Sequence, residues 1–240
     1  MIPISAHRPV GRIPMTWSLS MALLLIYAWQ SLLGDQVYSL IANGGLVPAR
    51  VGSATSWSVV GPTAQLMSLV THIFLHEGWV HVLSNIWCLL LFGGAVELAM
   101  GRIRYAAFFM VVGMFSGAGY AMAHSESVRA LIGASGAISG VMGAYLYLQP
   151  RAKVSTLLLP LPIRVQVPAW VYIVLWLVLQ AVLVVTTQNR EANIAFWAHI
   201  IGFVSGFGWA RIRFNGTAAR ERVERVRTED VQPWVGGEVQ

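Results

Sequence analysis

Six long stretches of the chain carry no charged residue, and each is about as long as a helix that crosses a membrane. They are residues 13–34, 78–96, 105–125, 130–150, 165–189 and 192–210. About 20 apolar residues in a helix span the hydrocarbon core of a bilayer. The pattern therefore predicts an all-α polytopic membrane protein with six transmembrane helices.

A seventh uncharged stretch, residues 51–76, has a different composition. It contains glycine, proline, several serines and threonines, and the polar side chains of Gln65, His72 and His76. Spread along a helix, these residues would leave polar groups facing lipid. We therefore expect a long outer loop, in or near the membrane interface, between the first and second transmembrane helices.

The composition supports a membrane protein. Charged residues make up 11% of the chain and hydrophobic residues 56%, whereas ordinary soluble domains are about 25% charged. Too few charged side chains remain to cover a water-facing surface. A scaffold of disulfides is excluded because Cys88 is the only cysteine. The net charge of +6 does not indicate a nucleic-acid partner, because the basic residues are distributed over several predicted loops.

The basic residues also predict the orientation. With six spans, all of them except Arg50, Arg129 and Arg190 fall on the side that holds both termini. Loops rich in lysine and arginine stay in the cytoplasm. We therefore expect both termini to be cytoplasmic. The expected location is a bacterial inner (cell) membrane. The predicted organisation is a cytoplasmic segment over residues 1–12, a membrane domain over 13–210 and a cytoplasmic tail over 211–240.

Four polar side chains are predicted to lie at a similar depth in the membrane. Counted from the outer ends of the second, fourth and sixth spans, His81, Asn85, Ser135 and His199 lie roughly 6–12 Å below the outer boundary, at about 1.5 Å per helical residue. Polar groups inside a membrane are costly and usually functional. A serine becomes a nucleophile when a base, usually histidine, lies within hydrogen-bonding reach. The layer is therefore a candidate site for nucleophilic catalysis.

Small residues repeat every four positions in the fourth and sixth spans. Such stripes let two helices approach backbone to backbone, and here they would bring Ser135 close to His199. At the start of its helix, Ser135 would also lie where free N–H groups stabilise an oxyanion. The residues assigned to helix packing are Gly133, Gly136, Gly140, Gly202 and Gly206.

No metal site or other cofactor is predicted. The segment "HEGWVH", which begins at His76, resembles the zinc-binding H-E-x-x-H motif but has one residue too many between its histidines. On a helix, His76 and His81 would point in different directions.

From about Thr71 to Gly206 the chain resembles the rhomboid intramembrane serine proteases. The resemblance rests on "HEGWVHVLSN", "FGGAVELAMG", "GASGAISGVMGA" and "AHIIGFVSG" in combination. It implies a six-helix rhomboid fold. It also implies a protease that cleaves transmembrane segments of other membrane proteins within the lipid bilayer. By the same resemblance, Ser135 is the nucleophile and His199 the general base. His81, Asn85 and the backbone N–H groups of Ser135 and Ala134 would support the oxyanion, and Glu97 would be structural.

Two positions depart from the family pattern. Many rhomboids have a Trp-Arg pair where this chain has Met67-Ser68, and an aromatic residue where it has Ser139. We expect a tyrosine at position 139 to be tolerated. Two other functions stay open: a catalytically inactive rhomboid-like protein that binds membrane clients, and a small transporter. The oligomeric state also stays open.

Overall fold

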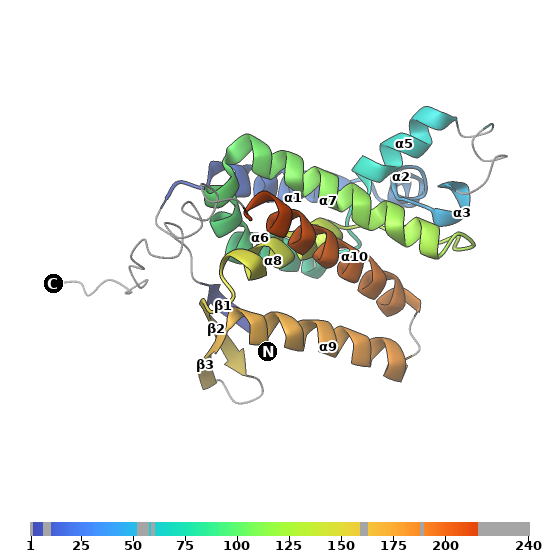
Figure 1. The fold of residues 1–240 in the computed structure, drawn as a ribbon. Coiled ribbons are helices and arrows are strands. Elements are labelled where there is room, and N and C mark those ends of the chain that lie inside the picture. Colours follow the sequence, from blue (N-terminus) through green and yellow to red (C-terminus); the bar gives the residue numbers. More distant parts are fainter. Residues whose placement is uncertain are drawn as a thin grey trace.

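The fold is a bundle of helices with a small sheet at one end (Figure 1). A computed structural model describes residues 2–6, 11–51, 58, 61–158, 163–187 and 190–215. The helices in these ranges are α1 (Pro14–Ser31), α2 (Gln36–Gly44), α3 (Pro48–Val51), α5 (Pro62–Thr71), α6 (Trp79–Met100), α7 (Arg102–Ala123), α8 (Ser135–Leu148), α9 (Ala169–Thr187) and α10 (Arg190–Arg213). The strands are β1 (Ile2–Ala6), β2 (Lys153–Leu158) and β3 (Ile163–Pro168).

Each of the six uncharged stretches overlaps one long helix. In chain order these helices are α1, α6, α7, α8, α9 and α10. Within the described part of the chain, α6 and α7 are long and apolar enough to cross a membrane, and Ala169–Val182 of α9 forms a shorter apolar helix. α8 has 14 residues and begins at Ser135. The five residues before it, predicted to be helical, form a bridge and a turn instead.

The prediction of an all-α fold is wrong, because three strands form an antiparallel sheet in the order β1-β2-β3. The positions of the charged residues predicted the loop between α8 and α9. They gave no sign of the strands in that loop, which show in its alternation of buried and exposed side chains. Val154 and Thr156 of β2 are fully buried, while Ser155 between them is more exposed. Alternate burial of β-branched residues is typical of a strand with one buried face. β3 also includes the first four residues of the predicted fifth span, 165–168.

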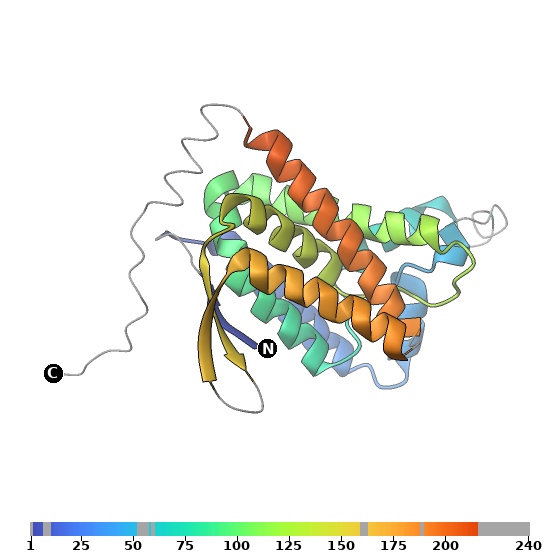
Figure 2. The same cartoon turned by 60° about the horizontal axis from the view of Figure 1, so that its bottom comes forward.

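The N-terminal segment is attached to the helical bundle through β1. The Nε1–H group of Trp87 in α6 donates a hydrogen bond to the carbonyl oxygen of Pro3 (2.7 Å). β1 also pairs with β2, from Ile2 opposite Leu157 to Ala6 opposite Val154. Figure 2 shows the three strands crossing one end of the bundle.

The region between α1 and α6 contains short helices as well as loops. Within residues 51–76, which we predicted to form a loop, α5 covers Pro62–Thr71. The side-chain hydroxyl of Thr71 donates a hydrogen bond to the carbonyl oxygen of Gly44 at the end of α2. α2, α3 and α5 gather at the end of the molecule away from the sheet, beside the end of α7 (Figure 1). Residues 52–57 and 59–60 of the predicted loop lie outside the described residues.

α8 is the central helix of the bundle. It packs against α6, α7, α9 and α10, and nearly all of its residues from Gly136 onward are buried. Figure 2 shows that α8 begins inside the bundle, whereas α7 extends further toward the end that carries α2, α3 and α5. The start of α8 is therefore recessed from that end of the molecule.

α8 and α10 approach each other so closely that their backbones touch. A Cβ atom added to Gly202 would collide with the carbonyl oxygen of Gly136, and one added to Gly206 would collide with that of Gly140. A Cβ atom on Gly140 would lie 3.0 Å from the carbonyl oxygen of Gly202 and would collide with Val112 of α7. Glycine at these positions is therefore required by the distance between the two helices.

A buried carboxylate caps the start of α1. Glu97, near the end of α6, accepts hydrogen bonds from the N–H groups of Met15 (3.0 Å) and Thr16 (2.7 Å), and from the hydroxyl of Thr16 (2.7 Å). The first N–H groups of a helix have no partner inside the helix, and negative charge is favourable at that end. Glu97 therefore fastens the first helix to α6.

We predict that Gly202→Val lowers the free energy of unfolding by about 1–3 kcal/mol or more, because its side chain must push the α10 backbone away from α8. Gly208→Val, on the same helix, should change stability little, because nothing lies within 4 Å of a Cβ atom there. Thermal unfolding in detergent compares the two variants. Equal losses of stability would show that the close approach of α8 and α10 is not the reason why a side chain at position 202 destabilises the protein.

We predict that Glu97→Ala destabilises the protein by about 3 kcal/mol, because it leaves buried donors of α1 without a partner. Glu97→Gln should cost less, because an amide oxygen still accepts hydrogen bonds. The same unfolding measurement checks both variants. A Glu97→Gln variant as unstable as Glu97→Ala would show that one acceptor oxygen at this position does not hold the start of α1.

Candidate active site

Ser135 is the first residue of α8 and is half-buried. The turn before it is held by two segments from the region between α1 and α6. The N–H group of Gly133 donates to the carbonyl oxygen of His72 (2.8 Å), and Leu46 and Leu131 exchange backbone hydrogen bonds (3.0 and 2.8 Å). Because Ser135 is the first residue of α8, its N–H group has no hydrogen-bond acceptor within the helix. It is therefore placed to bind an anionic oxygen.

Gly133 does not pack helices as we predicted, because it precedes α8. Its φ of 116° lies in a region that glycine adopts readily and other residues avoid. A Cβ atom at Gly133 would lie 2.8 Å from Nε2 of His81 and 3.8 Å from Oγ of Ser135. The missing side chain therefore leaves room for His81 beside Ser135.

His81 and Asn85 lie one turn apart near the start of α6. Asn85 is buried, and its Nδ2 atom has no hydrogen-bond partner. The ring of His81 packs edge-on against the ring of His76, with the centroids 5.0 Å apart. The backbone N–H and carbonyl groups of His76 are both hydrogen-bonded to the side-chain amide of Gln30 in α1. A buried donor without a partner is costly, so the Asn85 amide is available for a bound oxygen.

The segment at Met67-Ser68 is held by local hydrogen bonds. The Ser68 hydroxyl donates to the carbonyl oxygen of Gln65 (2.7 Å), and the Met67 side chain is exposed. Burial lowers the pKa of His72 to about 4. His72 is therefore neutral at neutral pH, and its Nδ1 lies 2.9 Å from the carbonyl oxygen of Ser68. These contacts fix the end of α5 without a Trp-Arg pair.

His199 is buried on α10, and three residues of α8 and α9 hold it. Its Nδ1 atom is hydrogen-bonded to Oε1 of Gln180. The ring of Trp176 lies over it at 5.3 Å between centroids, with an interplanar angle of 36°. The hydroxyl of Ser139 donates to the backbone carbonyl oxygen of His199 (2.7 Å). The Nε2 atom of His199 has no partner.

Ser135 and His199 lie on facing segments of α8 and α10. Ser139, one turn after Ser135, contacts the His199 backbone, and Gly136 contacts Gly202, which lies one turn after His199. No hydrogen bond joins the two side chains themselves, since Nε2 of His199 is unpaired. Bonds between catalytic groups are often long or misaligned before substrate binds and shorten in the complex.

Two residues around His199 were missed by the sequence analysis. Gln180 and Trp176 lie on α9, one turn apart, and contact the same ring. A usable signal was present, because Gln180 is the one amide side chain between Ala169 and Val185, among apolar residues. The expectation that a tyrosine is tolerated at position 139 conflicts with the structure. Ser139 is fully buried and hydrogen-bonded, and Trp176 already lies against the histidine ring.

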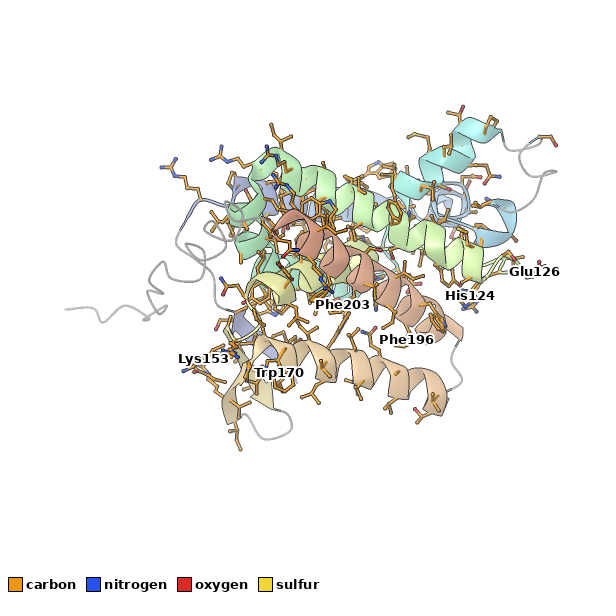
Figure 3. The ribbon with its side chains drawn as sticks, viewed as in Figure 1. His124, Glu126, Lys153, Trp170, Phe196 and Phe203 are labelled. Carbon is orange, nitrogen blue, oxygen red and sulfur yellow. The ribbon has the colours of Figure 1, made fainter. Side chains whose placement is uncertain are left out.

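Figure 3 labels residues at both ends of the molecule. His124 and Glu126 lie just after α7, beside the first turns of α10; at the other end Lys153 begins β2, and Trp170 lies in the first turn of α9. Within the ranges that the structure describes, no three His, Cys, Asp or Glu side chains are grouped as a metal ion would require.

Comparison with known proteins identifies relatives of one family. The family described as "Rhomboid domain" matches residues 63–216. The putative rhomboid protease YdcA of Bacillus subtilis is 31% identical over 97 residues, which are 40% of this chain and 48% of that protein. RHOMBOID-like protein 5 of Arabidopsis thaliana is 29% identical over 115 residues, which are 48% of this chain and 34% of that protein.

A third relative, the rhomboid protease GlpG of Salmonella newport, is 27% identical over 104 residues, which are 43% of this chain and 33% of that protein. The matches thus span about half or less of the length of these relatives. The family match covers well over half of this chain and includes α6 to α10, which carry Ser135 and His199. The chain therefore belongs to the rhomboid family.

Proposed function

We propose that the protein is an intramembrane serine endopeptidase that cleaves transmembrane segments of other membrane proteins near the outer face of the bilayer. The proposal rests on the arrangement of Ser135 in a rhomboid-family chain. This serine lies at the start of a buried helix, beside His81, and faces a histidine whose Nε2 atom is unpaired. A serine, a base and free N–H groups in one place are what acyl transfer requires.

Each step of the reaction can be assigned to a group of this site. The hydroxyl oxygen of Ser135 attacks the carbonyl carbon of the peptide bond while Nε2 of His199 takes the hydroxyl proton. The negative charge moves to the carbonyl oxygen, where the N–H groups of Ser135 and Ala134 and the side chains of His81 and Asn85 would stabilise it.

The tetrahedral intermediate then collapses. The carbon–nitrogen bond breaks, and His199 gives its proton to the leaving amine. A water molecule next attacks the ester on Ser135 while His199 accepts a proton from that water. When this second intermediate collapses, His199 returns the proton to the serine oxygen, and the acid product leaves.

The membrane arrangement is part of the proposal. In it α1, α6, α7, α8, α9 and α10 all cross the bilayer, the sheet and both termini lie on the cytoplasmic side, and α2, α3 and α5 lie at the outer face. The basic residues Arg151, Lys153 and Arg164, near the sheet, support this orientation. The recessed start of α8 supports a site below the outer surface. A substrate helix would have to unwind locally, since its carbonyl oxygens are hydrogen-bonded within the helix.

We predict that Ser135→Ala and His199→Ala each abolish cleavage of a fluorescent transmembrane substrate by the purified protein in detergent. Combining the two substitutions should add little, because the two groups act as a unit. Ser205→Ala is the matched control, because its hydroxyl bonds only within α10, to the carbonyl oxygen of Ile201. Cleavage by the Ser135→Ala variant near the wild-type rate would exclude Ser135 as the nucleophile. A wild-type protein that binds the substrate without cleaving it would instead favour a client-binding function.

We predict that His81→Ala and Asn85→Ala each slow cleavage without abolishing it. Loss of one oxyanion donor costs about 10²–10³ in kcat where it has been measured, and the backbone donors of α8 would remain. Leu83→Ala, an exposed position on the same helix, should leave kcat unchanged. A raised KM with an unchanged kcat would mean that the substituted residue binds substrate and does not stabilise the oxyanion.

A further inference from the structure

We propose that Gln180 of α9 is a positioning residue for His199, so that the working unit is Ser135–His199–Gln180. The inference rests on the proposed function and adds a third member to its Ser–His pair. The observation behind it is the hydrogen bond between Nδ1 of His199 and Oε1 of Gln180. Both residues lie in the bundle beside α8, on two helices that pack against each other.

The position of Gln180 is unusual for an amide. From Ala169 to Val185, α9 carries no other strongly polar side chain except the hydroxyl of Tyr172. Several of its neighbours on α9 are exposed apolar residues, among them Leu179 and Val182. A polar side chain in such a helix is costly unless it bonds to a partner inside the bundle. The partner of Gln180 is His199.

The hydrogen bond selects the tautomer of His199. An amide oxygen only accepts, so a bond to Oε1 requires the proton of the neutral imidazole to lie on Nδ1. The lone pair is then on Nε2, which is the nitrogen without a partner. This is the tautomer that can take a proton from a serine hydroxyl.

Trp176 fixes the same ring from another side. It precedes Gln180 by one helical turn, so the two side chains share one face of α9. Its indole lies 5.3 Å from the His199 ring, centroid to centroid. Ser139, which stands where many family members have an aromatic residue, instead binds the His199 backbone (2.7 Å). In this chain α9 therefore supplies the aromatic contact that position 139 lacks.

The inference is tested by the kinetics of Gln180→Met, Gln180→Glu and the control Leu179→Met, an exposed change next to Gln180. Gln180→Met keeps the volume but has no strong acceptor, so kcat should fall about tenfold or more with KM unchanged. Gln180→Glu keeps the acceptor and adds a negative charge that stabilises the imidazolium. At alkaline pH the Gln180→Glu variant should therefore be more active than Gln180→Met. As the pH is lowered, the Gln180→Glu variant should lose activity at a higher pH than the wild type does.

A residue that only fills space would not move the pH profile. Wild-type kcat and pH profile in Gln180→Met would overturn the inference while the proposed function stands. A Gln180→Glu variant as slow as Gln180→Met, with an unshifted profile, would also overturn it. A wild-type protein that cleaves nothing would overturn the proposed function, and the inference with it.

A measurement on the wild-type protein does not depend on how the variants fold. Nitrogen-15 NMR of protein labelled at histidine reports which imidazole nitrogen carries the proton, and the His199→Ala spectrum identifies the His199 signals. A neutral imidazole with its proton on Nδ1 is expected. A proton on Nε2 instead would overturn the inference whether or not the protein cleaves its substrate.

Discussion

The site depends on the contact between the backbones of α8 and α10. Gly202 lies against the Gly136 carbonyl and Gly206 against that of Gly140, so these helices are closer than side chains would permit. The helix that begins with Ser135 and the helix that carries His199 thus meet backbone to backbone at these glycines. Because packed interiors resist small displacements, the separation of the two catalytic candidates is set by main-chain geometry.

Polar groups inside the bundle differ in whether they have a hydrogen-bond partner. The Glu97 carboxylate is fully engaged with the start of α1 and has a structural role. By contrast, the buried side-chain nitrogen atoms without a partner, among the described residues, belong to His76, Asn85, Gln180 and His199. All four residues are in or next to the candidate site. Unpaired polar atoms are rare in native proteins and call for an explanation. In the proposed reaction Asn85 would bind the oxyanion, and Nε2 of His199 would accept the proton of Ser135.

Much of this organisation could be predicted from the sequence, because its signals are periodic or local. The uncharged stretches located the long helices, and the four-residue spacing of small residues located the contact between α8 and α10. The sheet was missed because its alternating residues lie in a short charged loop, and β1 pairs with a strand about 150 residues away in sequence. The roles of Gln180 and Trp176 were missed because contacts between α9 and α10 depend on how the helices rotate, which spacing along one helix does not determine.

The central claim, that Ser135 is a nucleophile activated by His199, is tested most directly by covalent labelling. A fluorophosphonate reacts with an activated serine, and mass spectrometry of the digested protein locates the adduct. The account predicts one adduct, on Ser135, that is lost in the His199→Ala variant although Ser135 remains. An unlabelled Ser135 in the folded wild-type protein, or labelling that is equal without His199, would contradict it.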